Sequence, residues 1–263
     1  FSGHPANDTL DTINRMFTFT TKCNNILACL LLEDFKNSIL MLKGDRDEFT
    51  DVEEYCVTPS MGVDVQSITY FRATSPLMHA WINIHYEKFV EAYHLVATAS
   101  KYIADCTPFF QLFILPFMSG YICTEILFRK QESQIGKTFD ELIIEIDGHI
   151  AALENYCKVM PRYLTCALHI LQGDRERLKR TEADSMKVIM SYQSAVSRAK
   201  ADYLPTIQAL AHLRLAHYLQ LKGFFPESFV SSINSAIDIY KTIGYNYMVT
   251  KLQEQNADLL HSV

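Results

Sequence analysis

Turn-forming residues are scarce in this chain, which has nine glycines and eight prolines among 263 residues. A β-sandwich or barrel needs many turns between short strands, so this scarcity argues against both architectures. Charged residues are also few, at 21%, against 49% hydrophobic residues. Such a chain can bury a sizeable core, which excludes disorder over its whole length. Its formal net charge of −6 gives no basic footprint for DNA, RNA or an anionic membrane.

The cysteines do not show a pattern typical of disulfides or of a zinc site. The seven cysteines are odd in number and show no CxxC spacing, and most lie among apolar residues. A disulfide framework or a zinc site is therefore not expected, and reduced thiols favour a cytoplasmic location. No signal peptide is present and the chain opens with Phe1, so we interpret it as a fragment of a larger protein.

A long uninterrupted apolar segment is also missing. The most hydrophobic stretch, 108–128, reaches membrane-spanning length but contains Gln111, Pro116 and Glu125. A buried helix fits this composition better than a membrane span. Its phenylalanines, from Phe109 to Phe117, could line a ligand groove or pack in the core.

A recurring stripe of apolar and small residues is the main positive feature. In segment 226–244 its members are Phe229, Ile233, Ala236, Ile237 and Tyr240. Their offsets of 0, +4, +7, +8 and +11 describe one face of an amphipathic helix. Related stripes begin at Phe35, Phe89, Phe139 and Val188.

Each stripe follows another apolar helix after a short break, which is typical of a stack of helical hairpins. The expected pairs are 8–43, 65–103, 108–157, 161–201 and 204–243, with a capping helix at 245–260. The expected breaks within the pairs are Glu33-Asp34, His85-Tyr86, the stretch near Gly136, Gly173-Asp174 and 223–225. The sequence therefore predicts an all-α, right-handed α-α superhelix of tetratricopeptide-like hairpins, forming one domain over 1–263.

Local signals for helix ends support these boundaries. Thr138 and Glu141 have the spacing of a capping box. First-turn prolines are expected at Pro161, Pro205 and Pro226. Glycines at helix C-termini are expected at Gly173, Gly223 and Gly244. Two prolines fall inside predicted helices, where Pro76 is expected to divide its helix and Pro116 to kink its own. Residues 44–64 are acidic, lack periodicity and predict a long loop.

The C-terminal third resembles the helical-repeat region of large multidomain sensor kinases. The resemblance rests on the turn from Leu219 to Gly223, the helix end from Tyr240 to Gly244, and a lysine-hydrophobic-x-glutamate element beginning at Lys251. Segment 79–103 resembles a helical hairpin of that family and segment 109–127 resembles its aromatic, leucine-rich helix, in the same order. In the family this region follows an AAA/STAND-type ATPase module and precedes GAF and histidine-kinase domains.

The resemblance implies a non-catalytic protein-interaction or regulatory module of a signal-transduction kinase or ATPase. Its partner would be a protein, a peptide or a neighbouring domain of the same chain, and neither nucleic acid nor a membrane span is expected. Candidate groove residues lie on the first helices of the pairs; they are His79, His85, Arg214 and His217. A structural scaffold subunit of a large assembly is an alternative, and an α-helical enzyme is a third.

Catalytic signatures are missing from the chain. It contains neither GxxxxGK[ST] nor GxGxxG, so an ATPase or kinase site would lie outside it. Glu91-x-x-His94 has the spacing of a di-iron ligand pair, but the second such element is absent. Glu145 and His149 are four residues apart on one helix and could hydrogen-bond. No catalytic residue, cofactor or metal is therefore expected.

Overall fold

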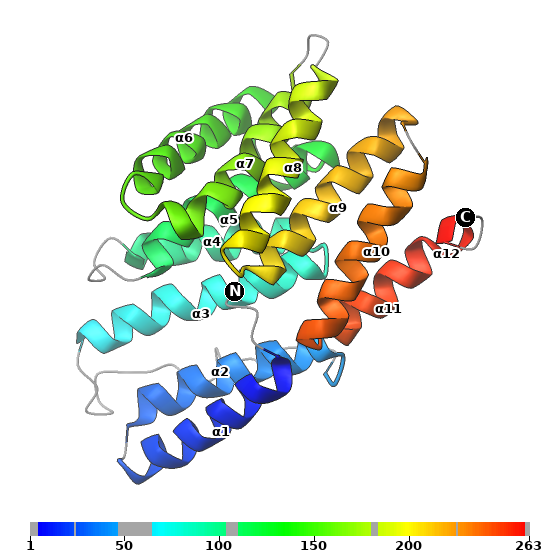
Figure 1. Cartoon of the computed structure of the whole chain (residues 1–263). Helices are drawn as coiled ribbons and strands as arrows, with labels where there is room; N and C mark the ends of the chain where they lie inside the picture. Colours follow the sequence, from blue (N-terminus) through cyan, green and yellow to red (C-terminus); the bar gives the residue numbers. More distant parts are fainter. Residues whose placement is uncertain are drawn as a thin grey trace.

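A computed structural model describes residues 5–23, 25–46, 65–103, 110–179, 184–224 and 226–260. Within these ranges every regular element is helical and no strand is present (Figure 1). The predicted all-α class is confirmed. Most of the expected acidic loop, from 47 to 64, and the expected pair boundary at 108 lie outside the described residues.

The helices follow one another in pairs along the chain. They are α1 (Ala6–Lys22), α2 (Ile26–Lys43), α3 (Val65–His85), α4 (Phe89–Ile103), α5 (Phe110–Phe128), α6 (Phe139–Cys157), α7 (Pro161–Arg177), α8 (Ser185–Ala201), α9 (Pro205–Lys222), α10 (Pro226–Ile243), α11 (Asn246–Gln255) and α12 (Ala257–Leu260). A 3-10 turn, η3 (Glu132–Ile135), lies between α5 and α6. Two short helices, α11 and α12, occupy the range expected for the cap.

Helix ends carry the features that the sequence predicts. The Thr138 hydroxyl accepts from the Glu141 backbone N–H, and the Glu141 carboxylate accepts from the Thr138 N–H at 2.8 Å. This reciprocal capping box satisfies backbone donors that the first turn of α6 would leave unpaired. Helices begin at Pro161, Pro205 and Pro226. Gly223 and Gly244 adopt the left-handed conformation directly after α9 and α10, which glycine tolerates without steric cost.

The expected break at Gly173-Asp174 is wrong, because α7 continues to Arg177. Gly173 lies inside the helix, where an added Cβ would be 2.6 Å from Cε1 of Tyr192 on α8. A glycine at this position therefore permits close packing of two helices and does not end one of them.

Two other breaks also differ from expectation. The first pair is divided at 23–25, and Asp34 lies inside α2, where it is 1% exposed. The Asn25 side chain begins α2 by accepting from the Ala28 N–H at 3.0 Å. Pro76 does not divide α3, which runs unbroken past it. Burial of Ala73, Leu77 and Ala80 around this proline offsets the missing backbone hydrogen bond, because tertiary packing dominates helix stability.

The later pairs pack on one another in chain order. Each first helix packs against its own partner and against the first helix of the next pair, in the order α3, α5, α7 and α9. Each second helix also packs against the first helix that follows it. This pattern, in which each layer contacts its neighbours, is consistent with a helical repeat.

The first pair is attached differently. His79 lies 3.4 Å from Asp34, and the Tyr86 hydroxyl donates to the Met41 carbonyl at 3.1 Å. Both contacts join residues 45 positions apart, so α2 and α3 run parallel. Helix α11 reaches the end of α3, because the rings of Tyr86 and Tyr247 stack 4.1 Å apart. Helix α11 also packs on α2, so the C-terminal part of the chain contacts the first pair (Figure 1).

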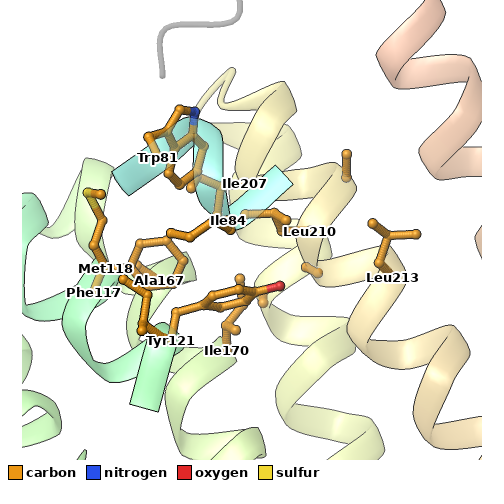
Figure 2. Close-up of a cluster of buried hydrophobic side chains, with 14 of the residues drawn as sticks. Trp81, Ile84, Phe117, Met118, Tyr121, Ala167, Ile170, Ile207, Leu210 and Leu213 are labelled. Atoms are coloured by element: carbon orange, nitrogen blue, oxygen red, sulfur yellow. The ribbon is translucent and has the colours of Figure 1, made fainter. Parts of the chain in front are cut away.

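The inner faces of α3, α5, α7 and α9 pack against one another, and we call this buried region the inner seam. Figure 2 shows its centre, where side chains of the four helices converge. The labelled members are Trp81, Ile84, Phe117, Met118, Tyr121, Ala167, Ile170, Ile207, Leu210 and Leu213, all of them buried. The chain's own side chains therefore fill the space between the first helices.

Candidate functional site

A continuous line of ion pairs crosses the inner seam. In order its members are Asp174, Arg214, Glu125, Arg129, Glu87 and Lys251. They come from α7, α9, α5, the turn after α5, the turn after α3, and α11. Three carboxylates alternate with three cations, so the line is balanced in charge. We call it the ion-pair line.

Arg214 is the most buried cation of this line, with 3% of its side chain exposed. Its guanidinium lies 3.1 Å from Asp174, pairs with Glu125 and sits 4.1 Å from the centre of the Tyr121 ring. Burial disfavours the charged form, but Asp174 and Glu125 outweigh it and raise the pKa of Arg214. Arg214 therefore remains a cation held by two carboxylates and an aromatic face.

The two carboxylates beside Arg214 respond differently to burial. Burial works against ionised Glu125, yet Arg214 and Arg129 hold its pKa below the ordinary value. Burial raises the pKa of Asp174, and Arg214 offsets only part of this effect. Asp174 also accepts a hydrogen bond of 2.7 Å from the Tyr192 hydroxyl. Ion pairs and this hydrogen bond thus compensate the buried carboxylates, as expected for groups with a structural role.

His85 is a second polar group of the seam and is 2% exposed. Its Nδ1 donates to the Trp81 carbonyl at 2.9 Å, and its ring meets the Trp81 ring edge-on at 4.8 Å. Burial lowers the pKa of His85 to about 4, so the ring is neutral at pH 7. The backbone carbonyl of His85 accepts from Lys251 at 2.9 Å, which joins α11 to the end of α3.

The four candidate groove residues do not gather on one accessible surface. His85 and Arg214 are buried in the seam, whereas His217 is exposed on α9. His79 lies at the α2–α3 contact beside Asp34, with 17% of its side chain exposed. The sequence indicated them as polar residues on apolar helices, but it could not distinguish an exposed position from a buried one.

An accessible cleft of about 220 Å³ lies between α4, α5 and α6. We call it the Glu145 cleft. Its lining residues are Tyr93, Val96, Ala97, Ser100, Ser119, Ile122, Cys123, Glu145 and His149. Glu145 forms an ion pair with Lys137, which precedes α6, and the Lys137 ammonium lies 5.7 Å from the centre of the Tyr93 ring.

Two further groups contact the Glu145 carboxylate. The Tyr93 hydroxyl donates to its Oε2 at 3.4 Å, and the Cys123 thiol donates to the same oxygen at 3.7 Å. Burial raises the pKa of the Cys123 thiol to about 12. This thiol stays protonated at pH 7, so it acts as a weak donor and does not become a nucleophile.

His149 completes the polar lining of the cleft. Burial lowers the pKa of its imidazole to about 4, so the ring is neutral at pH 7. The Glu145–His149 hydrogen bond that their spacing allows is not formed, since among the described residues nothing hydrogen-bonds to this ring. Gly120 lets α5 approach its neighbours closely, because an added Cβ there would lie 3.4 Å from His149 Cβ and 2.5 Å from Leu171 Cδ1. Sequence spacing indicated Glu145 and His149, but it missed Tyr93 and Cys123 on other helices.

A more open hollow of about 450 Å³ lies between α7 and the first half of α8. We call it the α7–α8 hollow. It is lined by His169, Gln172, Asp184, Met186, Lys187, Met190, Ser191 and Ser194. Met186 and Met190 are 63% and 58% exposed and lie four residues apart, on the same face of α8.

Two general features concern the described ranges only. No group of three or more histidine, cysteine or acidic side chains there is placed to hold a metal ion. Nor does any helix there combine the length and hydrophobicity needed to cross a membrane.

Comparison with known proteins gives no relative: no protein-family model, curated protein or solved structure matches this chain.

Proposed function

We propose that this chain is a non-catalytic interaction and regulatory module of a multidomain, cytoplasmic signal-transduction kinase or ATPase. In this proposal its hairpins form a right-handed, tetratricopeptide-like superhelix. The inner seam and the ion-pair line act as the rigid frame, and an outer surface contacts the partner. The partner is a protein, a peptide or a neighbouring domain of the same chain.

The observation that carries the proposal is the α7–α8 hollow. Two exposed methionines one helical turn apart border a concave surface that also offers hydroxyl, amide and imidazole groups. Methionine is flexible and polarisable, and such side chains are common on protein-binding surfaces that adapt to a partner. A volume of about 450 Å³ is also large enough for the anchoring side chains of a peptide.

Regulation would follow if a partner distinguished two states of the neighbouring domain. A partner shifts such a balance only by as much as its affinities for the two states differ. A contact to the α7–α8 hollow that exists in one state alone would provide this difference.

Site-specific photo-crosslinking in the full-length protein, in its own cells, tests the proposal. A benzoylphenylalanine at position 190 is expected to label one defined protein or neighbouring domain. The matched control is the same probe at position 144 on α6, where Ile144 is 71% exposed. Replacing Met186 and Met190 with Glu is expected to remove a crosslink formed from Ser194.

Equal, unspecific labelling from positions 190 and 144 would contradict the proposal. A crosslink from position 194 that still forms in the variant with glutamate at both methionine positions would also contradict it, because both charges would lie in the contact. A single product that accompanies the protein in fixed stoichiometry through purification would instead favour a scaffold subunit of a large assembly.

A further inference from the structure

One oxygen of the Glu145 carboxylate, which lines the cleft, receives only weak hydrogen bonds. Its Oε2 receives a Tyr93 O–H contact of 3.4 Å and a Cys123 S–H contact of 3.7 Å. A good O–H···O hydrogen bond is about 2.7–2.8 Å long, and a thiol is a weak donor. This oxygen can therefore accept a stronger hydrogen bond from a ligand.

The groups around Oε2 are suited to a cation with a short apolar body. The Tyr93 ring offers its face, and the neutral His149 ring can accept a hydrogen bond. Val96, Ala97 and Ile122 supply apolar wall. At about 220 Å³ the cleft is smaller than the about 300–1,000 Å³ typical of drug-sized ligands, so a small group fits it best.

The protein's own Lys137 shows that an ammonium group is accepted here. Its Nζ pairs with Glu145 Oε1 and lies 5.7 Å from the Tyr93 ring centre. Lys137 stands in the segment between η3 and α6, with 31% of its side chain exposed. A partly exposed ion pair of this kind contributes only modestly to stability, so the lysine can give way to a competing cation.

We propose that the Glu145 cleft binds an alkylammonium group, carried by a small primary amine or by a lysine side chain, in competition with Lys137. The ammonium donates to Glu145 Oε2 and to the His149 ring and lies against the Tyr93 face. Its alkyl part contacts Ala97, the exposed apolar residue of the lining. This site is separate from the α7–α8 hollow, so the failure of either proposal leaves the other standing.

Titration of the isotope-labelled chain with n-butylammonium chloride, followed by amide NMR signals of α4 and α6, tests the proposal. Saturable shifts confined to the cleft are expected, and the uncharged isostere n-butanol should not produce them.

Glu145→Gln is expected to weaken binding at least about tenfold, because it removes a charge-assisted hydrogen bond. Lys137→Gln is expected to strengthen binding several-fold, because it removes the internal competitor. The matched control, Lys158→Gln at an exposed lysine after α6, should leave the affinity unchanged.

A second variant tests the cleft even if Glu145→Gln fails to fold. Ala97→Phe at an exposed lining position fills the cleft without removing a polar group, and it should abolish the shifts. Nα-acetyl-lysine-N-methylamide distinguishes the two sources of the ligand. Tighter binding than n-butylammonium indicates a lysine of a protein partner, and weaker binding indicates a free amine. Unchanged affinity in Glu145→Gln, equal shifts with n-butanol, or weaker binding in Lys137→Gln would overturn the proposal.

Discussion

At the scale of single residues, the inner seam is unusual because it buries charge as well as hydrocarbon. Arg214 lies between Asp174 and Glu125, and all three side chains are at most 10% exposed. Removing a charge from water costs several kcal/mol per ion, and this cost nearly cancels the attraction between the paired ions. The intact set of ion pairs therefore contributes little net free energy to folding. Its members nevertheless depend on one another, because removing one leaves an uncompensated charge.

We expect Arg214→Ala to lower the free energy of unfolding by about 3–5 kcal/mol, since two buried carboxylates lose their cation. The matched control is Arg175→Ala on α7, which breaks the pair with the half-exposed Asp147 and should cost about 0–1 kcal/mol. Urea unfolding of the two variants and the parent provides the measurement. Equal costs would show that the buried pairs contribute no more than a surface pair.

His85 makes stability depend on pH. Its pKa is about 4 in the folded chain and 6.5 when unfolded, so below pH 6.5 the unfolded chain binds the additional proton. Stability is therefore fully present above pH 6.5 and falls as pH drops towards 4. Between pH 7 and pH 4.5 the loss from this one group is about 2–3 kcal/mol.

Replacement of His85 by Gln should remove that part of the pH dependence, whatever it does to stability at pH 7. The measurement is urea unfolding at pH 7 and pH 4.5. His94→Gln, at an exposed position of α4, serves as the control and should keep the parent slope. A His85→Gln chain with an unchanged slope would show that the imidazole is not neutral in the folded state.

At the scale of the helices, much of the structure could be predicted because helix signals are local. The Thr138 capping box, the first-turn prolines and the glycines after α9 and α10 depend on residues within one turn of each other. The sequence predicted helix breaks at Gly173 and Asp34, but both residues lie inside helices, because the side chains that pack around them come from other helices. A glycine at a helix end and a glycine at a helix crossing look alike in sequence until the neighbouring helix is known.

Two glycines in helix interiors provide a matched pair for this point. Alanine at Gly148 on α6 meets open space, so Gly148→Ala should stabilise the protein by about 0.5–1 kcal/mol. Gly173→Ala places a Cβ 2.6 Å from the Tyr192 ring and should destabilise it by about 1–3 kcal/mol. Thermal unfolding of both variants checks the opposite signs. Stabilisation by both substitutions would mean that α7 and α8 are not in close contact at Gly173.

The candidate site shows the same limit. The spacing of Glu145 and His149 placed both on one face of α6, but the cleft exists only because α4 and α5 bring Tyr93 and Cys123 to that face. The hydrogen bond that this spacing allows is not formed, and Lys137 and Tyr93 contact the carboxylate instead. Sequence periodicity describes one helix at a time and cannot show which neighbours converge.

At the scale of the whole molecule, the distinctive feature is that the array returns to its own beginning. Tyr247 of α11 stacks on Tyr86, and Lys251 of the same helix pairs with Glu87 at 2.9 Å. Lys251 is also the last member of the ion-pair line that starts at Asp174. The first helices therefore enclose a filled seam, whereas an extended solenoid would leave its inner face open to solvent.

Trp81 tests this central claim most directly, because it is the only tryptophan of the chain and lies in the seam with 5% of its surface exposed. Iodide quenching of its fluorescence should be weak in the folded chain and should rise strongly in urea. A control with Trp81→Phe and Tyr203→Trp carries the indole at a position where Tyr203 is 78% exposed, and it should be quenched readily when folded. A filled seam predicts a large difference between the two folded proteins. Quenching of Trp81 as strong as that of the control would show an open inner face and contradict the closed arrangement.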